Sequence, residues 1–250
     1  SSWGYGIQSI VIHYLHAYGT DEQKNKWLPK LISGTSVAAL AMTEPGAGSD
    51  LQAIKTSAKR DGNQYKLNGS KIFITNGGSA DLVVVAAKTD QEAGAKGISL
   101  ILLDTNEAEG FSRGTPLKKL GLKGNDTAEL FFDDIKIPLT NLIGPEEGQG
   151  FYQMMRQLPW ERLLIGITAL GAIDFALEET IKYVQERKAF GKRIMDLQNT
   201  RFKLAEAKTK AEVLRSFVND CIGRLINGKL DAATASMAKY WGSQIQNEVM

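Results

Sequence analysis

One stretch of ten residues, 41–50, combines residue types that suit a polar or anionic ligand. It follows the apolar run 37–40, so a buried strand is expected to end there in a loop. Two glycines leave the loop backbone bare, and Thr43 and Ser49 add hydroxyl donors, a combination that fits a pyrophosphate or the polar edge of a flavin. The same Pro-Gly pattern is also typical of a tight turn that needs these residues for geometry alone.

A carboxylate in an apolar setting is the candidate for proton transfer. Glu161 lies in the run 157–165 among bulky apolar residues, where loss of water would make the carboxylate a stronger base. Pro159 could kink the helix and turn this face toward a ligand. The alternative is an intrahelical ion pair with Arg162 or with charged neighbours one turn away.

Two further stretches carry groups that could contact a ligand. Asn68–Gly78 is interpreted as an Asn-Gly hairpin turn followed by a strand that contains Phe73 and Thr75. Phe73 is otherwise typical of a strand core. The segment 186–193 is basic at an expected helix end, where lysines complement the helix dipole.

Helical periodicity flanks a central region without it. One helix is expected from the start of the chain, and a second from the capping box at 20–23 to Gly34. After residue 150 we expect a long helix through Glu186, another from about 197 to 227, and a last one that runs to Met250. The ends lack start and stop signals, which predicts that the sequence is an internal fragment.

The central region is predicted to be a series of short strands without long helices between them, which favours an antiparallel sandwich or barrel. The expected fold class is therefore α+β, an antiparallel β-domain (36–145) between an N-terminal helical part (1–35) and a truncated C-terminal up-and-down helix bundle (146–250). The expected strands are Val37–Thr43, Thr56–Arg60, Gln64–Leu67, Lys71–Thr75, Leu82–Ala87, Ile98–Leu103 and Leu130–Ile137.

Composition narrows the function classes only loosely. Thirty basic and 28 acidic side chains nearly cancel, so the chain has no strong net electrostatic field. Net charge therefore gives no support to nucleic-acid or membrane-surface binding. The single cysteine, Cys221, cannot form an internal disulfide and is expected to be a small buried helix residue, which fits a reducing compartment. No apolar run reaches the length of a membrane span, and no metal-ligand cluster is expected.

In order and spacing, the motifs at 41–50, 68–78, 161–162 and 186–192 resemble those of the acyl-CoA dehydrogenase family, and the resemblance covers essentially all 250 residues. The sequence of residues 158–241 is most similar to that of the long-chain members. The resemblance implies an FAD-dependent α,β-dehydrogenation of acyl-CoA thioesters to trans-2-enoyl-CoA in fatty-acid β-oxidation, with Glu161 as the base for the α-proton. Family members place this base either on this helix or near the C-terminus.

The resemblance also implies cofactor contacts from three segments. Thr43 and Thr75 would lie at strand ends and face one flavin, and Phe73 would flank its ring system without the indole N–H that many members supply there. Arg187 would reach the pyrophosphate of a neighbouring subunit's cofactor. The implied FAD residues are Leu40, Met42, Thr43, Gly48, Ser49, Phe73, Ile74, Thr75, Arg187, Phe190 and Gln198.

The implied substrate residues are Ser49, Ala95, Lys96, Tyr152, Pro159, Trp160, Glu161 and Arg162. The loop near Ala95 and Lys96 is expected to pass the pantetheine or nucleotide end of CoA, although a solvated loop lysine is the simpler interpretation of Lys96. Family members polarise the thioester carbonyl partly with a segment that would lie beyond Met250, so the isolated 250-residue chain is expected to be inactive.

The implied partners are an acyl-CoA substrate, an electron-transfer flavoprotein as acceptor, and further copies of the chain in a homodimer or homotetramer. The implied location is the cytoplasm of a bacterium or the mitochondrial matrix of a eukaryote. Two alternatives remain: an acyl-CoA oxidase reaction on the same fold, and a catalytically dead scaffold or dimerisation module. Comparing dye reduction with peroxide formation distinguishes an oxidase from a dehydrogenase. A bound yellow cofactor argues against a catalytically dead scaffold.

Overall fold

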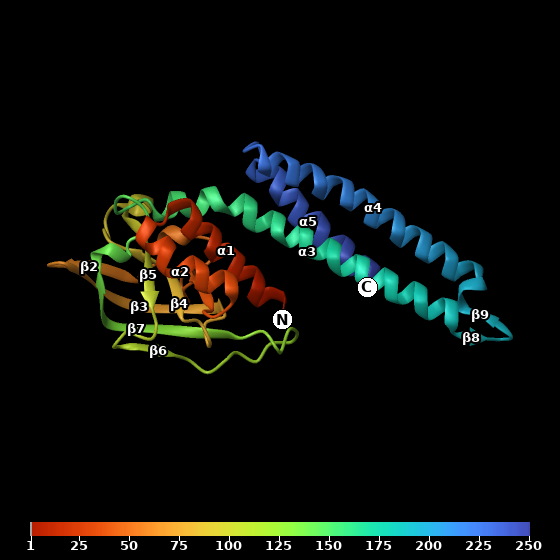
Figure 1. Ribbon diagram of the computed structural model, residues 1–250, viewed down its shortest axis with the longest axis horizontal. Coiled ribbons are helices and arrows are strands. Elements are labelled where there is room, and N and C mark those ends of the chain that lie inside the picture. The colour runs from red at the N-terminus through yellow and green to blue at the C-terminus, as the bar shows by residue number, and fades with distance from the viewer. Residues whose placement is uncertain (1) are drawn as a thin grey trace. The chain divides into compact units, whose positions relative to one another are not determined.

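The computed structural model describes residues 2–250, which divide into two units, one up to Met155 and one comprising Arg156–Met250. The first unit begins with two helices, α1 (Ser2–Tyr18) and α2 (Asp21–Ser33), which lie against the sheet that follows (Figure 1). The predicted capping box is confirmed, because the Thr20 hydroxyl accepts from Gln23 N and the Gln23 side chain accepts from Thr20 N. Gly34 ends α2 in the left-handed conformation.

The sheet of the first unit has seven strands in the order β1-β4-β2-β3-β7-β6, with β5 paired to β4. Most pairings are antiparallel, as predicted, whereas β4 runs parallel to β1 and to β2. The strands are β1 (Ala38–Ala41), β2 (Ser57–Asp61), β3 (Gln64–Thr75), β4 (Leu82–Lys88), β5 (Ile98–Asp104), β6 (Phe111–Arg113) and β7 (Thr127–Pro138). Only short 3₁₀ turns interrupt this region: η1 (Leu51–Ala53), η2 (Gly94–Gly97) and η3 (Leu139–Asn141).

The predicted hairpin turn at Asn68-Gly69 is wrong, because β3 continues through it as one strand. β3 pairs with β7 on both sides of this point, and the cooperative ladder outweighs the local turn preference. The true hairpin turn joins β2 to β3 at Gly62, with φ 59°. Gly69 keeps a different role: a side-chain carbon there would lie 2.5 Å from Thr56 Oγ1, so only glycine fits.

The second unit consists mainly of the long helices α3 (Gly150–Glu186, from Arg156 onward), α4 (Gln198–Ile226) and α5 (Ala232–Val249), which run side by side in Figure 1. The hairpin of β8 (Lys188–Ala189) and β9 (Lys192–Arg193) and the turn η4 (Ile194–Asp196) connect α3 to α4. Leu163, Leu214 and Ile245 belong to one buried apolar cluster built from all three helices. Cys221 lies in the same cluster as a free, buried thiol, as predicted.

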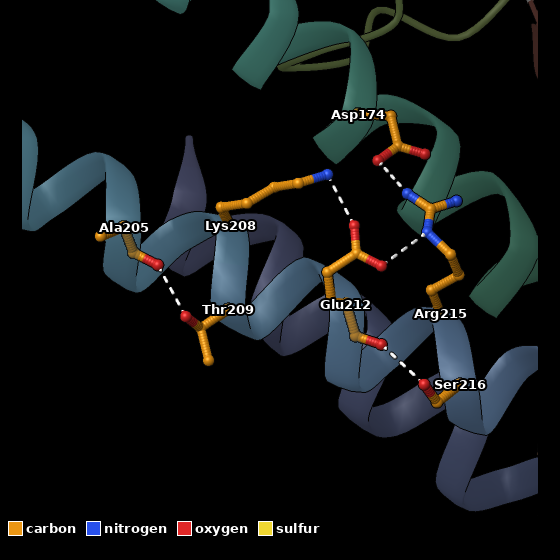
Figure 2. Close-up of polar contacts among 7 residues, drawn as sticks. All are labelled: Asp174, Ala205, Lys208, Thr209, Glu212, Arg215 and Ser216. Carbon is orange, nitrogen blue, oxygen red and sulfur yellow. Dashed lines mark hydrogen bonds and ion pairs between the residues drawn. The ribbon is translucent and has the colours of Figure 1, made fainter.

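Charged side chains on α3 and α4 add an exposed network to this apolar contact. Figure 2 shows Arg215 donating to Asp174 of α3 (Nη2 to Oδ1, 2.5 Å) and to Glu212 of its own helix, while Lys208 pairs with Glu212 at 2.6 Å. Because these groups remain partly in water, the network adds little to stability. Across the part of the chain that the structure describes, no helix combines the length and apolarity needed to cross a membrane.

Candidate functional site

The loop after β1 has an open face of bare backbone. Glu44 and Ala47 exchange backbone hydrogen bonds of 2.9 and 3.1 Å, which close a tight turn with Gly46 inside it. Neither Gly46 nor Gly48 has a left-handed φ, and a side-chain carbon at either position would meet no atom within 4 Å. The chain itself therefore does not require glycine at these two positions, whereas close approach of an outside ligand would.

A strained aromatic residue lies in the middle of β3. Phe73 has φ 61° at a register shift between Lys71 and Ile74, and its side chain is 63% exposed. A left-handed conformation is costly for a bulky residue and is retained where the surroundings or a function demand it. The position therefore presents an aromatic ring outward, and the interpretation of Phe73 as a core residue is wrong.

The two predicted flavin segments of the first unit lie side by side. Ile72 N donates to Thr43 O at 2.9 Å, which joins the loop after β1 to β3. Within the described residues, the hydroxyls of Thr43, Ser49 and Thr75 form no hydrogen bond to the protein and remain available as donors. The side chains of Leu40 and Ile74 are buried, so those two residues can offer only backbone groups to a ligand.

A buried ion pair beneath this loop was missed from the sequence. Lys71 Nζ lies 2.9 Å from Glu44 Oε1 and donates to Met42 O at 2.9 Å, and its side chain is fully buried. Glu44 also accepts from Lys55 N at 2.6 Å and from Thr56 N at 3.0 Å. In β3 every second side chain points inward, as Tyr65 and Leu67 do, and Lys71 falls on the same alternation. A lysine at an inward position of a strand is the sequence signal that could have predicted a buried ion pair.

The two charges of this pair respond differently to their surroundings. Burial lowers the pKa of Lys71 to about 8, although Glu44 acts in the opposite direction. Burial alone would raise the pKa of Glu44, but the Lys71 charge and the hydrogen bonds from Thr56, Lys55 and Lys71 together lower it below its ordinary value. The 2.9 Å contact between the two side chains is that of an ion pair.

The turn after Thr75 is held by three residues that the sequence analysis did not single out. Asn76 Nδ2 donates to Gly4 O and Ala38 O, at 2.9 and 3.0 Å. Asp126 accepts from Gly78 N and from the Ser79 hydroxyl. Arg113 caps the turn by donating from Nε to Gly77 O at 3.0 Å and from Nη2 to Ala80 O at 2.7 Å. These contacts fix the strand end that carries Thr75.

Four of the predicted substrate residues belong to the first unit: Ser49, Ala95, Lys96 and Tyr152. The turn η1, which follows Ser49 after Asp50, contacts η2, which contains Ala95 and Lys96. The Lys96 side chain is exposed. Tyr152, in the first turn of α3, is partly exposed and packs edge-on against Phe151 at 5.9 Å.

In the second unit, Glu161 lies on α3, which continues without a break through Pro159. Pro159, Trp160, Glu161 and Arg162 are all half-buried. Arg162 Nη1 donates to the Ser236 hydroxyl of α5 at 3.1 Å. The guanidinium next to Glu161 in sequence is thus held by the neighbouring helix.

The remaining predicted cofactor residues, Arg187, Phe190 and Gln198, lie in or beside the segment that connects α3 to α4. Ile194 N donates to Arg187 O at 2.9 Å and closes the β8–β9 hairpin. Phe190 is at the hairpin tip with φ 52° and is 92% exposed, and Arg187 and Gln198 are exposed as well. The hairpin therefore presents one aromatic ring and several cations to solvent.

Three family models match successive parts of the chain. They are the acyl-CoA dehydrogenase N-terminal domain (residues 1–35), middle domain (39–135) and C-terminal domain (148–250). A crystal structure of an acyl-CoA dehydrogenase from Geobacillus kaustophilus superposes with a TM-score of 0.89 at 48% identity, over 96% of this chain and 63% of that one. The chain belongs to the acyl-CoA dehydrogenase family, and it has that family's fold.

Among curated proteins, the mitochondrial long-chain specific acyl-CoA dehydrogenase of Rattus norvegicus is 51% identical over 249 residues. The match covers 98% of this chain and 57% of that protein's length. The CarC subunit of the caffeyl-CoA reductase–Etf complex of Acetobacterium woodii is 41% identical over 92% of this chain and 60% of its own length.

A glutaryl-CoA dehydrogenase from Mycobacterium smegmatis in complex with FADH2 superposes with a TM-score of 0.87 at 32% identity, over 98% of this chain and 61% of that one. The similar proteins thus include a mitochondrial enzyme, bacterial enzymes and a flavin complex.

Proposed function

We propose that the full-length protein is an FAD-dependent acyl-CoA dehydrogenase that removes one hydrogen from each of the α and β carbons of an acyl-CoA thioester. The observation that carries this proposal is the cradle formed by the bare glycine loop and the outward Phe73, joined by the hydrogen bond from Ile72 N to Thr43 O. Family membership supplies the class of chemistry, and the cradle supplies a place for the cofactor.

The donor set fits a flavin. Thr43, Ser49 and Thr75 offer hydroxyls, and Phe73 offers an apolar face. The backbone N–H groups of Gly46, Gly48 and Ser49 are available as further donors, whereas that of Ala47 is bonded to Glu44 O. When bound, the flavin accepts the hydride that leaves the β carbon. The contribution of the chain in this unit is to bind and orient the cofactor and to tune the polarity at its edge.

We assign proton abstraction to Glu161. The carboxylate takes the α-proton, whose acidity the thioester carbonyl provides, so that the α and β C–H bonds break and a carbon–carbon double bond forms between those carbons. The Glu161 side chain is half-buried on α3. Tyr152, Pro159, Trp160 and Arg162 on the same helix, together with Ser49, Ala95 and Lys96, are proposed to line the path of the acyl-CoA.

Arg187, Phe190 and Gln198 are proposed to contact the flavin of a second copy of the chain. Their exposure and the guanidinium of Arg187 suit a pyrophosphate brought by a partner. We infer a homodimer or homotetramer for this reason. An electron-transfer flavoprotein is the proposed acceptor, in keeping with the Etf complex to which the Acetobacterium woodii relative belongs. The proposed compartment is the cytoplasm in a bacterium and the mitochondrial matrix in a eukaryote.

The decisive experiment measures flavin bleaching when the full-length, flavin-loaded protein is mixed anaerobically with straight and branched acyl-CoAs. Glu161→Gln should slow bleaching by about 10²- to 10⁴-fold because the general base is lost. Flavin content should not change. The preferred acyl chain will be the substrate that gives the fastest bleaching in the unsubstituted protein.

Glu178→Gln is the matched control, because Glu178 is a carboxylate on the same helix that is 66% exposed and, among the described residues, pairs only with Lys182. This variant should bleach at the rate of the unsubstituted protein. Full bleaching in Glu161→Gln would refute the assignment of the base. Peroxide formation at the rate of turnover would assign the protein to the oxidase class instead.

A further inference from the structure

The buried pair of Lys71 and Glu44 joins segments that surround the loop 42–49, which we call the flavin loop. Lys71 Nζ holds Met42 O at 2.9 Å, at the point where the chain leaves β1. Glu44 holds the N–H groups of Lys55 and Thr56, at the point where the chain enters β2. The segment 42–56 between β1 and β2 is therefore tied to Lys71 of β3 at both ends, directly at Met42 O and through Glu44 at Lys55 and Thr56.

Packing alone does not account for this arrangement. A buried ion pair loses the hydration of two charges, and apolar residues of similar volume commonly stabilise a fold at least as well. An ion pair with directional hydrogen bonds instead specifies position, since each donor and acceptor accepts a narrow range of geometry. The residue next to Lys71 supplies the N–H group that binds Thr43 O, so the pair adjoins the direct link between the two flavin segments.

We propose that Glu44 and Lys71 are positioning residues for the flavin: their ion pair holds the loop 42–49 against β3 in the arrangement that binds the cofactor. This inference rests on the proposed function and deepens it. Neither residue is proposed to touch the reacting atoms. Their effect passes through the backbone of the loop.

The test compares Lys71→Met, Glu44→Gln and the double variant in the full-length protein. The dissociation constant for FAD, the visible absorption bands of bound flavin, and hydrogen exchange at Lys55, Thr56 and Ile72 are measured. Each variant should bind FAD at least tenfold more weakly, shift the flavin bands and exchange faster at these three amides. Glu44→Gln keeps the shape of the side chain, so this variant can test the proposal by the same measurements if Lys71→Met fails to fold.

Lys66→Met is the matched control. Lys66 lies on the same strand and pairs with Asp134 at 2.7 Å, but that pair is exposed to solvent. Its loss should leave FAD affinity, flavin bands and exchange at the three amides unchanged. An effect equal to that of Lys71→Met would overturn the proposal, because any lysine of the strand would then suffice.

The double variant separates positioning from stability. It leaves no unpaired buried charge, so its resistance to urea should recover toward that of the unsubstituted protein. Its FAD affinity should remain at least tenfold low, because Met42 O has lost its donor. If the double variant recovers both FAD affinity and stability, the positioning role is overturned but the proposed function is not. If the unsubstituted protein retains no flavin, the proposed function itself is overturned.

Discussion

Lys71 and Phe73 are two residues apart on β3, yet one side chain is fully buried and the other is largely exposed. In a regular strand they would share a face. The left-handed φ of Phe73 and the register shift at this point break the alternation. One strand thereby supplies both a buried anchor for the flavin loop and an outward ring for the proposed cofactor.

At the residue scale we predict a specific acid sensitivity. The folded pKa of Glu44 lies below its ordinary value of 4.5, so the stability that its ionised form contributes is present above pH 4.5 and is lost as pH falls through the folded pKa. Each unit of lowering is worth about 1.4 kcal/mol. Urea unfolding at pH 7, 5, 4 and 3 should show a smaller loss of unfolding free energy in Glu44→Gln than in the unsubstituted protein.

Glu178→Gln again provides the comparison for this titration. Its carboxylate is exposed, and the variant should follow the pH dependence of the unsubstituted protein. If Glu44→Gln also follows it, the Glu44 carboxylate does not contribute to folding through its ionised form.

At the scale of elements, α3 and α5 cross at two glycines. The Gly166 Cα lies 3.1 Å from the position that a side-chain carbon of Gly242 would occupy. A side-chain carbon at Gly166 would in turn lie 2.9 Å from Ala238 O, a backbone atom that cannot move without shifting α5. The absence of side chains at these positions therefore sets the distance between the helices.

Gly166→Ala should lower the unfolding free energy by about 1–3 kcal/mol, because the helices must separate to admit the methyl group. Gly171→Ala on the same helix should raise it by about 0.5–1 kcal/mol, since a side-chain carbon there meets no atom within 4 Å and alanine favours the helix. Denaturant unfolding of both variants checks this. Equal effects of the two changes would show that the crossing tolerates a side chain.

At the scale of the whole molecule, the proposed functional residues are shared between two units. The flavin loop and β3 belong to the first, whereas Glu161 and Arg187 belong to the second. We retain the three-part division at residues 35/36 and 145/146 as a proposal. In the described structure, α1 and α2 group with the sheet in one unit.

The proposed completion of the flavin site by a second copy predicts that cofactor retention depends on assembly. Arg187→Met should weaken FAD binding about 10- to 100-fold, the expected loss for one charge-assisted contact to a phosphate, without changing the oligomer. Sedimentation and flavin fluorescence on dilution should show flavin release together with dissociation of the unsubstituted protein. Lys192→Met, in the same hairpin, should behave as the unsubstituted protein, and monomers that retain flavin would refute the shared site.

Much of the fold could be predicted because its signals are local. The capping box at Thr20, the stop at Gly34 and the long helical periods after residue 150 each depend on neighbours within one or two turns. The turn at Asn68-Gly69 could not be predicted correctly, since pairing of β3 with the distant strand β7 decides it. For the candidate site, the motifs located the loop, Thr75, Glu161 and Arg187 in advance, but their roles remain proposals.

The sequence by itself determined the family, the order of helices and strands, and the residue types available for flavin chemistry. Motif spacing and periodicity depend only on the order of residues along the chain, so they can be recognised without the fold. Only the tertiary structure revealed that Lys71 reaches Glu44 and Met42, that Phe73 points outward from a strained bulge, and that Gly166 meets α5. The reason is physical: burial, ion pairing and close approach depend on segments far apart in sequence, and their partners are known only once the chain has folded.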